Sequence, residues 1–343
     1  MKIEAWWFEN KQKPEDILQP EWSPRTHFGI YAEIEDIVCP FTLCVTAKTG
    51  DLLLYKKEFV LESGEQTGDS YESACYDGGL NFTGFAEDVT GLPEEMFIEI
   101  KMPGKTYRER IACEYARLYG KITDFDGNPF PAPVMLARIG FAGGSGMGVW
   151  SNQGGEYSIV VPKGCYNTFY VDDNSYGVST LENWSWHMIV DRDEEHNFKV
   201  GNGEVYSLSL WSNNGGSSTQ FFWFRPMILP SIKKKEYEIE LGGEKRNVTD
   251  ISPELKAEDI TVTRNGVALE VISLQKIYET GNSYTMPSYI VQTKRDNGLP
   301  TTGKQTVILE YDTAKRGGEQ DYIARSQGRC QFYYKDMTAL SLK

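Results

Sequence analysis

The residues of this sequence best suited to bind a ligand are aromatic and amide side chains between positions 176 and 225. Four of the eight tryptophans lie within forty residues of one another, beside asparagines and an arginine. A sugar ring stacks its C–H face on a flat aromatic ring, and its hydroxyls pair with amide, carboxylate or guanidinium groups. This chemistry predicts a saccharide site formed by Tyr176, Trp184, Trp186, Trp211, Asn213, Asn214, Trp223 and Arg225.

A second interpretation assigns the same aromatic residues to a protein core. Trp184 and Trp186 are two positions apart, so they share one face of a strand, and Trp211 and Trp223 fit neighbouring strands. The cores of β-sandwiches are commonly aromatic. Exposed tryptophans would indicate a binding protein, whereas buried ones would indicate a structural protein.

Paired carboxylates offer a third interpretation, a glycan-active enzyme or its accessory subunit. The pair considered is Glu182 with Asp172 or Asp191, since glycoside hydrolysis uses two carboxyl groups about 5–10 Å apart. The three histidines form no recognisable arrangement with a nucleophile. No catalytic residue is therefore assigned, and a non-catalytic function is preferred.

No metal or cofactor is predicted. Nitrogen and carboxylate ligands do gather at His187, Asp191, Asp193, Glu194, Glu195 and His196. In an acidic protein a charged surface turn is the simpler account of such a group. The glycine-rich segment 143–148 lacks the pattern of a nucleophile elbow or a P-loop, and 124–128 does not continue as an EF-hand.

Two blocks of strand and turn residues lie in the middle of the chain. The first is Gly120-Lys121-Ile122-Thr123-Asp124-Phe125-Asp126-Gly127-Asn128-Pro129, and the second is Gly155-Glu156-Tyr157-Ser158-Ile159-Val160-Val161-Pro162-Lys163-Gly164-Cys165-Tyr166. In this order they resemble the carboxypeptidase regulatory-like family, a transthyretin-like β-sandwich module, over about residues 118–171. The resemblance implies a binding or scaffolding unit without catalytic residues.

The zinc enzyme that gives this family its name is excluded. Its metal site needs a His-x-x-Glu pair, and none of His27, His187 and His196 is followed three positions later by Glu.

Short alternating runs separated by turns predict an all-β fold of tandem β-sandwich domains, immunoglobulin-like or transthyretin-like, because no helical periodicity is sustained. We expect an N-terminal aromatic arm over 1–24 and a first sandwich over 25–115. The regulatory-like sandwich with an extension follows over 116–230, and an immunoglobulin-like sandwich over 231–343. Asn265-Gly266 predicts a hairpin turn in the last domain.

The charge distribution indicates which classes of macromolecule the chain is expected to bind. The formal net charge is −14, and all of the excess negative charge falls before Ser231. Such a chain repels phosphate backbones, so nucleic acid is not an expected partner. The stretch from Glu58 to Glu99 has no Lys or Arg and is expected to be a solvated acidic face. Trp6, Trp7 and Phe8 offer a contact for a homo-oligomer.

The expected compartment is the cytoplasm, with six reduced cysteines, because neither a signal peptide nor a membrane-spanning stretch is visible. A secreted chain trimmed of its signal would look the same. The preferred function is a non-catalytic binding or scaffold protein with a carbohydrate ligand. The alternatives are the glycan-active enzyme or subunit, and a purely structural assembly protein.

Overall fold

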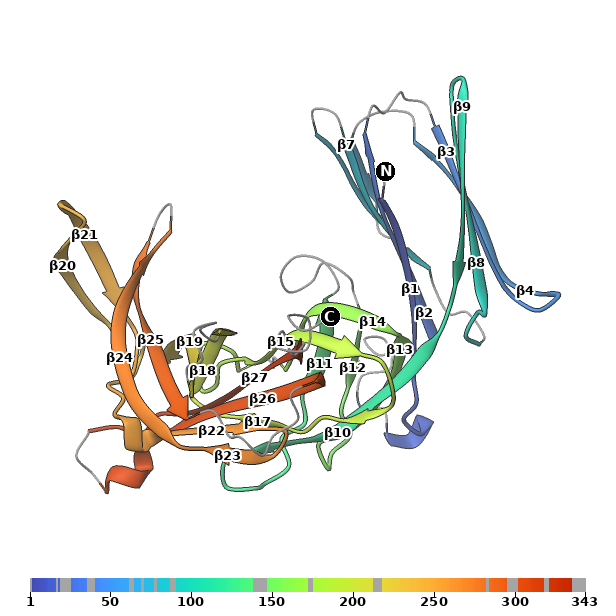
Figure 1. The fold of residues 1–343 in the computed structure, drawn as a ribbon. Helices are drawn as coiled ribbons and strands as arrows, with labels where there is room; N and C mark the ends of the chain where they lie inside the picture. Colours follow the sequence, from blue (N-terminus) through green and yellow to red (C-terminus); the bar gives the residue numbers. More distant parts are fainter. Residues whose placement is uncertain are drawn as a thin grey trace, which may run out of the picture. The chain divides into compact units, whose positions relative to one another are not determined.

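The computed structural model describes residues 2–16, 18, 26–35, 41–61, 65–68, 71–76, 79–86, 91–137, 147–171, 175–211, 218–281, 284–294, 302–317 and 321–334. In these ranges every regular element is a β-strand except three short 3-10 helices, η1 (Pro14–Asp16), η2 (Ala257–Asp259) and η3 (Thr313–Arg316). The predicted all-β fold class is therefore confirmed (Figure 1). No helix in the described ranges is long and apolar enough to cross a membrane.

The chain divides into two compact units that interleave in sequence. Unit 1 comprises residues 1–120, 142–164 and 190–196, and unit 2 comprises 121–141, 165–189 and 197–343. The segment 116–230, predicted to be one domain, contributes to both units. Composition and local periodicity cannot reveal this, because they carry no information about which distant strands pair.

Unit 1 contains a large sheet in which the N-terminal residues form a strand. Residues 1–24 were predicted to be an arm, but residues 2–10 pair antiparallel with the next strand, from Lys2↔Glu33 to Glu9↔Thr26, and Glu9 also lies opposite Val160. The spatial order is β16 (Glu194–Glu195), β10 (Tyr115–Asp124), β13 (Glu156–Pro162), β1 (Lys2–Asn10), β2 (Thr26–Glu35), β7 (Gly79–Ala86), β6 (Tyr71–Tyr76) and β5 (Glu65–Gly68). A short strand, β12 (Met147–Trp150), contacts β13.

A second sheet in unit 1 packs against the N-terminal strand. Its spatial order is β4 (Leu52–Leu61), β3 (Phe41–Thr49), β8 (Glu95–Met102) and β9 (Lys105–Ala112). Met96, Ile98 and Ile100 on β8 are buried in alternation with more exposed residues. The ring of Trp7 on β1 lies 6.0 Å from that of Tyr55 on β4, so the two sheets form a sandwich.

The aromatic residues at the N-terminus are part of this core. Trp7 and Phe8 are 0% and 1% exposed, and the indole N–H of Trp7 donates to the Gly91 carbonyl at 3.0 Å. The side chain of Trp6 lies outside the described residues. An oligomer contact through this segment stays a prediction, and the burial of Trp7 and Phe8 gives it no support.

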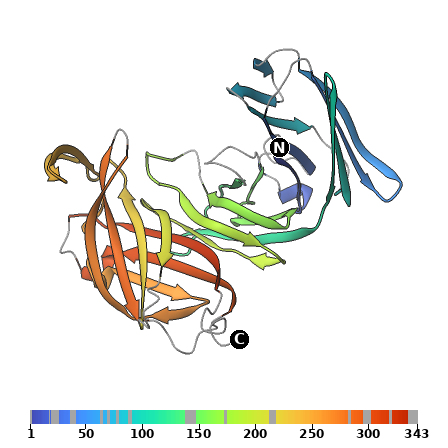
Figure 2. The same cartoon turned by 45° about the horizontal axis from the view of Figure 1, so that its top comes forward.

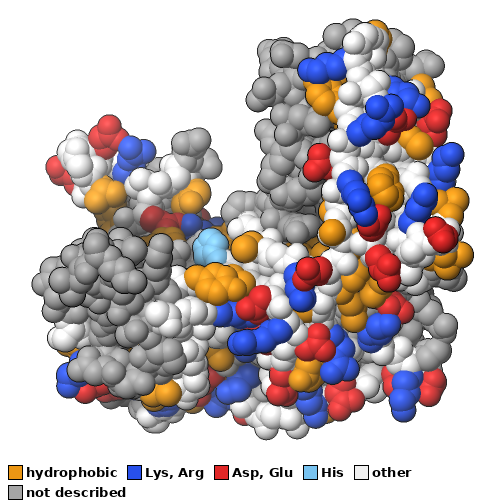
Figure 3. All heavy atoms as spheres, turned by 45° about the vertical axis from the view of Figure 1, so that its right-hand side comes forward, with side chains coloured by type: hydrophobic (Ala, Val, Ile, Leu, Met, Phe, Trp, Pro, Cys, Tyr) orange, Lys and Arg blue, Asp and Glu red, His pale blue; other side chains and the backbone are white. Residues whose placement is uncertain are grey.

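The outer face of β8 and β9 has compensated charges. Arg108 pairs with Glu99 at 2.7 Å, and Arg110 pairs with Glu95. Acidic and basic side chains lie intermixed on the face seen in Figure 3. The last carboxylates of the predicted acidic stretch thus face arginines from the adjacent strand. The side chains of residues 61–90, which make up most of that stretch, lie outside the described residues.

Unit 2 is built on two further sheets (Figure 2). One includes, in spatial order, β11 (Pro133–Ala137), β14 (Gly164–Val171), β15 (Asn183–Val190), β27 (Arg325–Tyr334), β26 (Gly303–Asp312), β22 (Ile260–Arg264) and β23 (Val267–Leu269). The other has the order β18 (Gly203–Trp211), β19 (Thr219–Ile228), β25 (Thr285–Lys294) and β24 (Val271–Thr280). A short strand, β17 (Phe198–Val200), pairs in parallel with the end of β10, and β20 (Lys235–Leu241) forms a hairpin with β21 (Glu244–Asp250).

Strands from both sides of the predicted boundary at Pro230 pair with one another. β15 runs parallel to β27, with Trp186 opposite Cys330, and β19 runs antiparallel to β25, with Phe222 opposite Val291. The boundary therefore falls inside unit 2. The core between the two sheets joins residues from all these strands, including Trp184, Trp186, Val205, Phe222, Phe224, Val262, Val291, Val307, Leu309 and Cys330.

The predicted hairpin turn at Asn265-Gly266 is confirmed between β22 and β23. Both residues have positive φ, 50° and 79°, as a type I′ turn requires. The side chain of Asn265 also accepts a hydrogen bond from the backbone N–H of Thr306 at 2.8 Å. This turn therefore fixes the register of β22 against β26 as well as against β23.

Candidate functional site

Two of the predicted ligand-binding aromatics, Trp184 and Trp186, lie side by side inside unit 2. Trp184 and Trp186 stack with ring centroids 5.1 Å apart, and Tyr170 stacks on Trp184 at 4.4 Å. The ring of Tyr206 meets both tryptophans edge-on, at 5.8 and 5.1 Å. The two tryptophans share a strand face, as predicted, but each is only 4% exposed. We call Tyr170, Trp184, Trp186 and Tyr206 the aromatic stack.

Arg225 lies against this stack and has internal partners. Its guanidinium carbon is 5.0 Å from the centre of the Tyr206 ring and 5.2 Å from that of Tyr284. The side chain forms an ion pair with Glu279, and Nη2 donates to the Tyr284 hydroxyl at 3.2 Å. The Arg225 and Glu279 side chains are 13% and 17% exposed. Cation–π contacts and a charge-assisted pair thus occupy the arginine that was predicted to bind sugar hydroxyls.

A buried carboxyl, Glu204, completes the group. It is 2% exposed, and burial raises its pKa well above the usual carboxyl range. The negative charge of Glu182 raises the pKa further, while Trp184 and Arg225 lower it in part. A neighbouring carboxyl raises the pKa of a buried one because their negative charges repel, an arrangement that acid–base enzymes use in an open cleft.

The carboxylate pair differs from the predicted one. Glu182 lies beside Glu204, which sequence reasoning missed; Asp172 is outside the described residues, and Asp191 belongs to unit 1. The only signal for Glu204 was an acid within the apolar run of β18. Glu204 is buried, so neither a water nucleophile nor a sugar can reach its carboxyl group from solvent.

The remaining predicted site residues do not belong to the stack. Trp211 is 41% exposed and stacks on Phe221 at 5.4 Å with an interplanar angle of 11°. Tyr176 is 50% exposed in a turn that pairs with Thr180. Trp223 is half-buried on β19, and Asn213 and Asn214 lie outside the described residues.

The segment from His187 to His196 is only in part the charged surface turn that was predicted, because His196 at its end is buried. His187 is exposed on β15 with a positive φ of 54°, whereas His196 is fully buried. The backbone N–H of His196 donates to the Tyr119 carbonyl at 2.8 Å, and its carbonyl accepts from the Tyr157 hydroxyl at 2.5 Å. Among the described residues no group of three or more His, Cys, Asp or Glu side chains could hold a metal ion.

The described cysteines lie in different environments and form no disulfide with one another. Cys44 and Cys113 are half-buried, Cys165 is exposed and Cys330 is buried. Burial raises the pKa of the Cys330 thiol to about 12, so it stays protonated and unreactive at neutral pH. The side chains of Cys39 and Cys75 lie outside the described residues.

Comparison with known proteins assigns no family to the chain. No family model and no curated protein sequence matches it. The crystal structure of the major pilin subunit of Bacillus cereus is similar over 64% of this chain and 69% of that chain, with 11% identity and a TM-score of 0.22. A streptococcal ancillary pilin is similar over 86% of this chain and 89% of that chain, with 9% identity and a TM-score of 0.18. Likeness at this level decides neither fold nor function.

Proposed function

We propose that this chain is a non-catalytic structural or scaffold protein built from β-sheet units. The observation that carries the proposal is the burial of the aromatic stack, with Trp184 and Trp186 each 4% exposed. A saccharide site would present such rings to a cleft. Here their faces contact one another and Tyr206, and the adjacent arginine is paired with Glu279. These residues stabilise the sandwich of unit 2.

The test compares folding with ligand binding. Trp184→Ala should lower the free energy of unfolding by about 3–5 kcal/mol, as the loss of a large core aromatic does. On a glycan array, the wild-type protein should show no binding that is lost in Trp184→Ala. If Trp184→Ala melts at the wild-type temperature and abolishes glycan binding, the residue is a ligand contact and the structural proposal is wrong.

A second candidate function is saccharide binding by the exposed ring of Trp211, which stacks on the half-buried Phe221. It is favoured by the 41% exposure of Trp211 and by its near-parallel stacking on Phe221, which fixes the ring orientation. Trp211→Ala should abolish binding of any glycan found on an array while lowering the melting temperature by no more than about 4 °C. Absence of an array signal for the wild type removes this candidate.

We also propose that residues 118–171 form a carboxypeptidase regulatory-like module. The first block supports this: Gly120–Thr123 lies in β10, and the Asp124 carboxylate accepts from the backbone N–H groups of Asp126 and Asn128 at 2.9 and 2.8 Å. The second block supplies β13 and β14, with Lys163 between them. A fragment spanning 116–175 that melts cooperatively would support an autonomous module, and an unfolded fragment would oppose it.

A further inference from the structure

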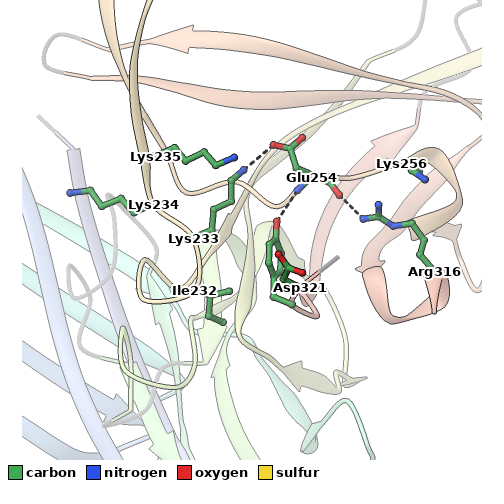
Figure 4. Close-up of a pocket in the computed structure, with 9 residues that line it drawn as sticks. Ile232, Lys233, Lys234, Lys235, Glu254, Lys256, Arg316 and Asp321 are labelled. Carbon is green, nitrogen blue, oxygen red and sulfur yellow. Dashed lines mark hydrogen bonds and ion pairs between the residues drawn. The ribbon is translucent and has the colours of Figure 1, made fainter. Parts of the chain in front are cut away.

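A pocket with a basic lining lies in unit 2, and none of its lining residues belongs to the aromatic stack. It is an open pocket of about 710 Å³, lined by Ile232, Lys233, Lys234, Lys235, Glu254, Lys256, Arg316, Asp321 and Tyr322 (Figure 4). Five of these side chains are cationic and two are anionic, in a protein whose net charge is −14. The residues come from the turn after β19, the start of β20, the segment between β21 and η2, the end of η3 and the segment before β27.

Two of the cations are held in place by buried contacts. The Lys233 side chain is 5% exposed, with Nζ 3.3 Å from Asp250 Oδ1 and 3.0 Å from Glu254 Oε1. Burial alone would lower the pKa of Lys233, but Glu254 and Asp250 raise it above the usual value, so the amine stays charged. Arg316 is also 5% exposed, with Nε 2.9 Å from Asp259 Oδ1. Side chains fixed in this way lose little entropy when a ligand binds.

The carboxylate of Glu254 shows that this space accommodates anionic oxygen. Its side chain is 57% exposed, and Oε1 lies 3.0 Å from Lys233 Nζ and 3.7 Å from Lys276 Nζ. Arg316 approaches from the other side, where Nη2 donates to the Glu254 carbonyl at 2.6 Å. In Figure 4, Lys233 and Arg316 reach toward Glu254 from opposite sides of the pocket. Lys233 Nζ already donates to Asp250, to the Ser252 carbonyl and to Glu254, so only its positive charge would act on a second anionic group beside Glu254.

The rim adds cations that face solvent. Lys235 and Lys256 are exposed, and in Figure 4 Lys235 points toward Glu254 whereas Lys234 points away from it. Lys234 forms an ion pair with Glu236 at 3.0 Å. Lysines at the rim attract an anion from solution and can hydrogen-bond to it, whereas the buried Lys233 contributes only its charge.

We propose that this pocket binds a small, multiply charged anion that carries phosphate or carboxylate groups. Its volume is that of a site for a small organic molecule. Ammonium and guanidinium groups form their strongest hydrogen bonds with phosphate and carboxylate oxygens. A nucleic acid fits less well, because its long backbone would meet the negative field of the rest of the chain.

The test uses tripolyphosphate and citrate as probes in isothermal titration calorimetry on the full chain. Wild-type protein should bind at least one of them with a Kd below about 1 mM at low salt, and the tighter probe shows whether the site prefers phosphate or carboxylate. The double variant Lys235→Gln/Lys256→Gln should bind about tenfold more weakly, a change of about 1.4 kcal/mol. Both substitutions are at exposed positions, so the variant should fold normally.

The matched control is Lys245→Gln/Lys294→Gln. It removes the same charge from side chains that are 79% and 59% exposed and lie outside the pocket lining. Its Kd should stay within about twofold of the wild-type value, because distant exposed charges are screened. Equal weakening by both double variants, or no binding of either probe to the wild type, would overturn the proposal.

Discussion

Lys233 and Asp250 form a buried ion pair, with Nζ 3.3 Å from Oδ1 and side chains only 5% and 3% exposed. Asp250 ends β21, and its two oxygens accept several further hydrogen bonds. The donors are Lys276 Nζ at 3.2 Å, the Tyr237 hydroxyl at 3.1 Å, and the backbone N–H and hydroxyl of Ser252 at 2.9 and 2.7 Å. This carboxylate therefore joins the hairpin of β20 and β21 to β24 and to the floor of the basic pocket.

Loss of this carboxylate should destabilise unit 2 strongly. Asp250→Asn leaves Lys233 buried without its full counter-charge, so the free energy of unfolding should fall by about 3–5 kcal/mol. Urea denaturation measures the change. Glu238→Gln is the control, since Glu238 pairs with Lys245 on the exposed hairpin, where such pairs contribute about 0–1 kcal/mol. Equal effects of the two substitutions would contradict a role for the buried pair.

The same residue should give unfolding a characteristic acid dependence. Burial alone would raise the pKa of Asp250, but Ser252, Lys233 and Lys276 lower it to about 2. Because the folded pKa lies below that of the unfolded carboxyl, near 4, ionised Asp250 stabilises the fold above that pH. The contribution, about 2 kcal/mol, is lost as the pH falls from about 4 through 2.

Comparison with Asp250→Asn isolates this contribution from those of other carboxyls. The difference in unfolding free energy between wild type and variant should be constant between pH 5 and pH 7 and shrink below about pH 4. A difference that stays constant down to pH 2 would show that Asp250 does not titrate in this way.

The effect of pH on stability through Glu204 should be opposite to that through Asp250. Burial, followed by the charge of Glu182, raises its pKa, so folding is penalised as the pH rises above the pKa of the unfolded carboxyl. Glu204→Gln keeps the shape and removes the titration. Its melting temperature relative to wild type should rise between pH 4 and pH 8 by several degrees. An identical difference at both values would mean that the carboxyl is ionised without penalty.

The two classes of tryptophan should separate cleanly in melts. Trp184→Ala should cost about 3–5 kcal/mol because it removes a ring from the middle of the aromatic stack. Trp211→Ala should cost less than about 1 kcal/mol, since the ring is 41% exposed at the end of β18. Chemical denaturation of both variants under the same conditions tests the contrast, and similar losses would refute it.

Local sequence patterns predicted many of the strands and the turn at Asn265-Gly266, but they missed the strand Lys2–Asn10. The run from Thr219 to Ile228 alternates between buried and partly buried residues along its whole length, and Asn265-Gly266 forms its expected turn. Period-two alternation depends only on neighbouring residues, so one sequence suffices to detect it. Pairing of Ser185 with Arg329, on the other hand, depends on residues far apart in the chain, and this is why the domain boundaries were not predictable.

The candidate site was predictable only in part, for the same reason. The spacing of Trp184 and Trp186 showed that they share a face, but their burial depends on Tyr206 and on strands β18 and β19. Glu204 became a partner of Glu182 only through folding. The basic pocket draws on Lys233, Glu254 and Arg316, which no single sequence motif connects.

The position of β27 has a consequence for how the protein is synthesised. β27 is the last described strand, yet it lies between β15 and β26 in the interior of its sheet. Until residues 325–334 leave the ribosome, β15 and β26 each lack a neighbour, and their open backbone groups can pair with another chain. Unit 2 therefore completes its folding only after residues 325–334 have emerged, and premature termination upstream of Arg325 yields a product prone to aggregation.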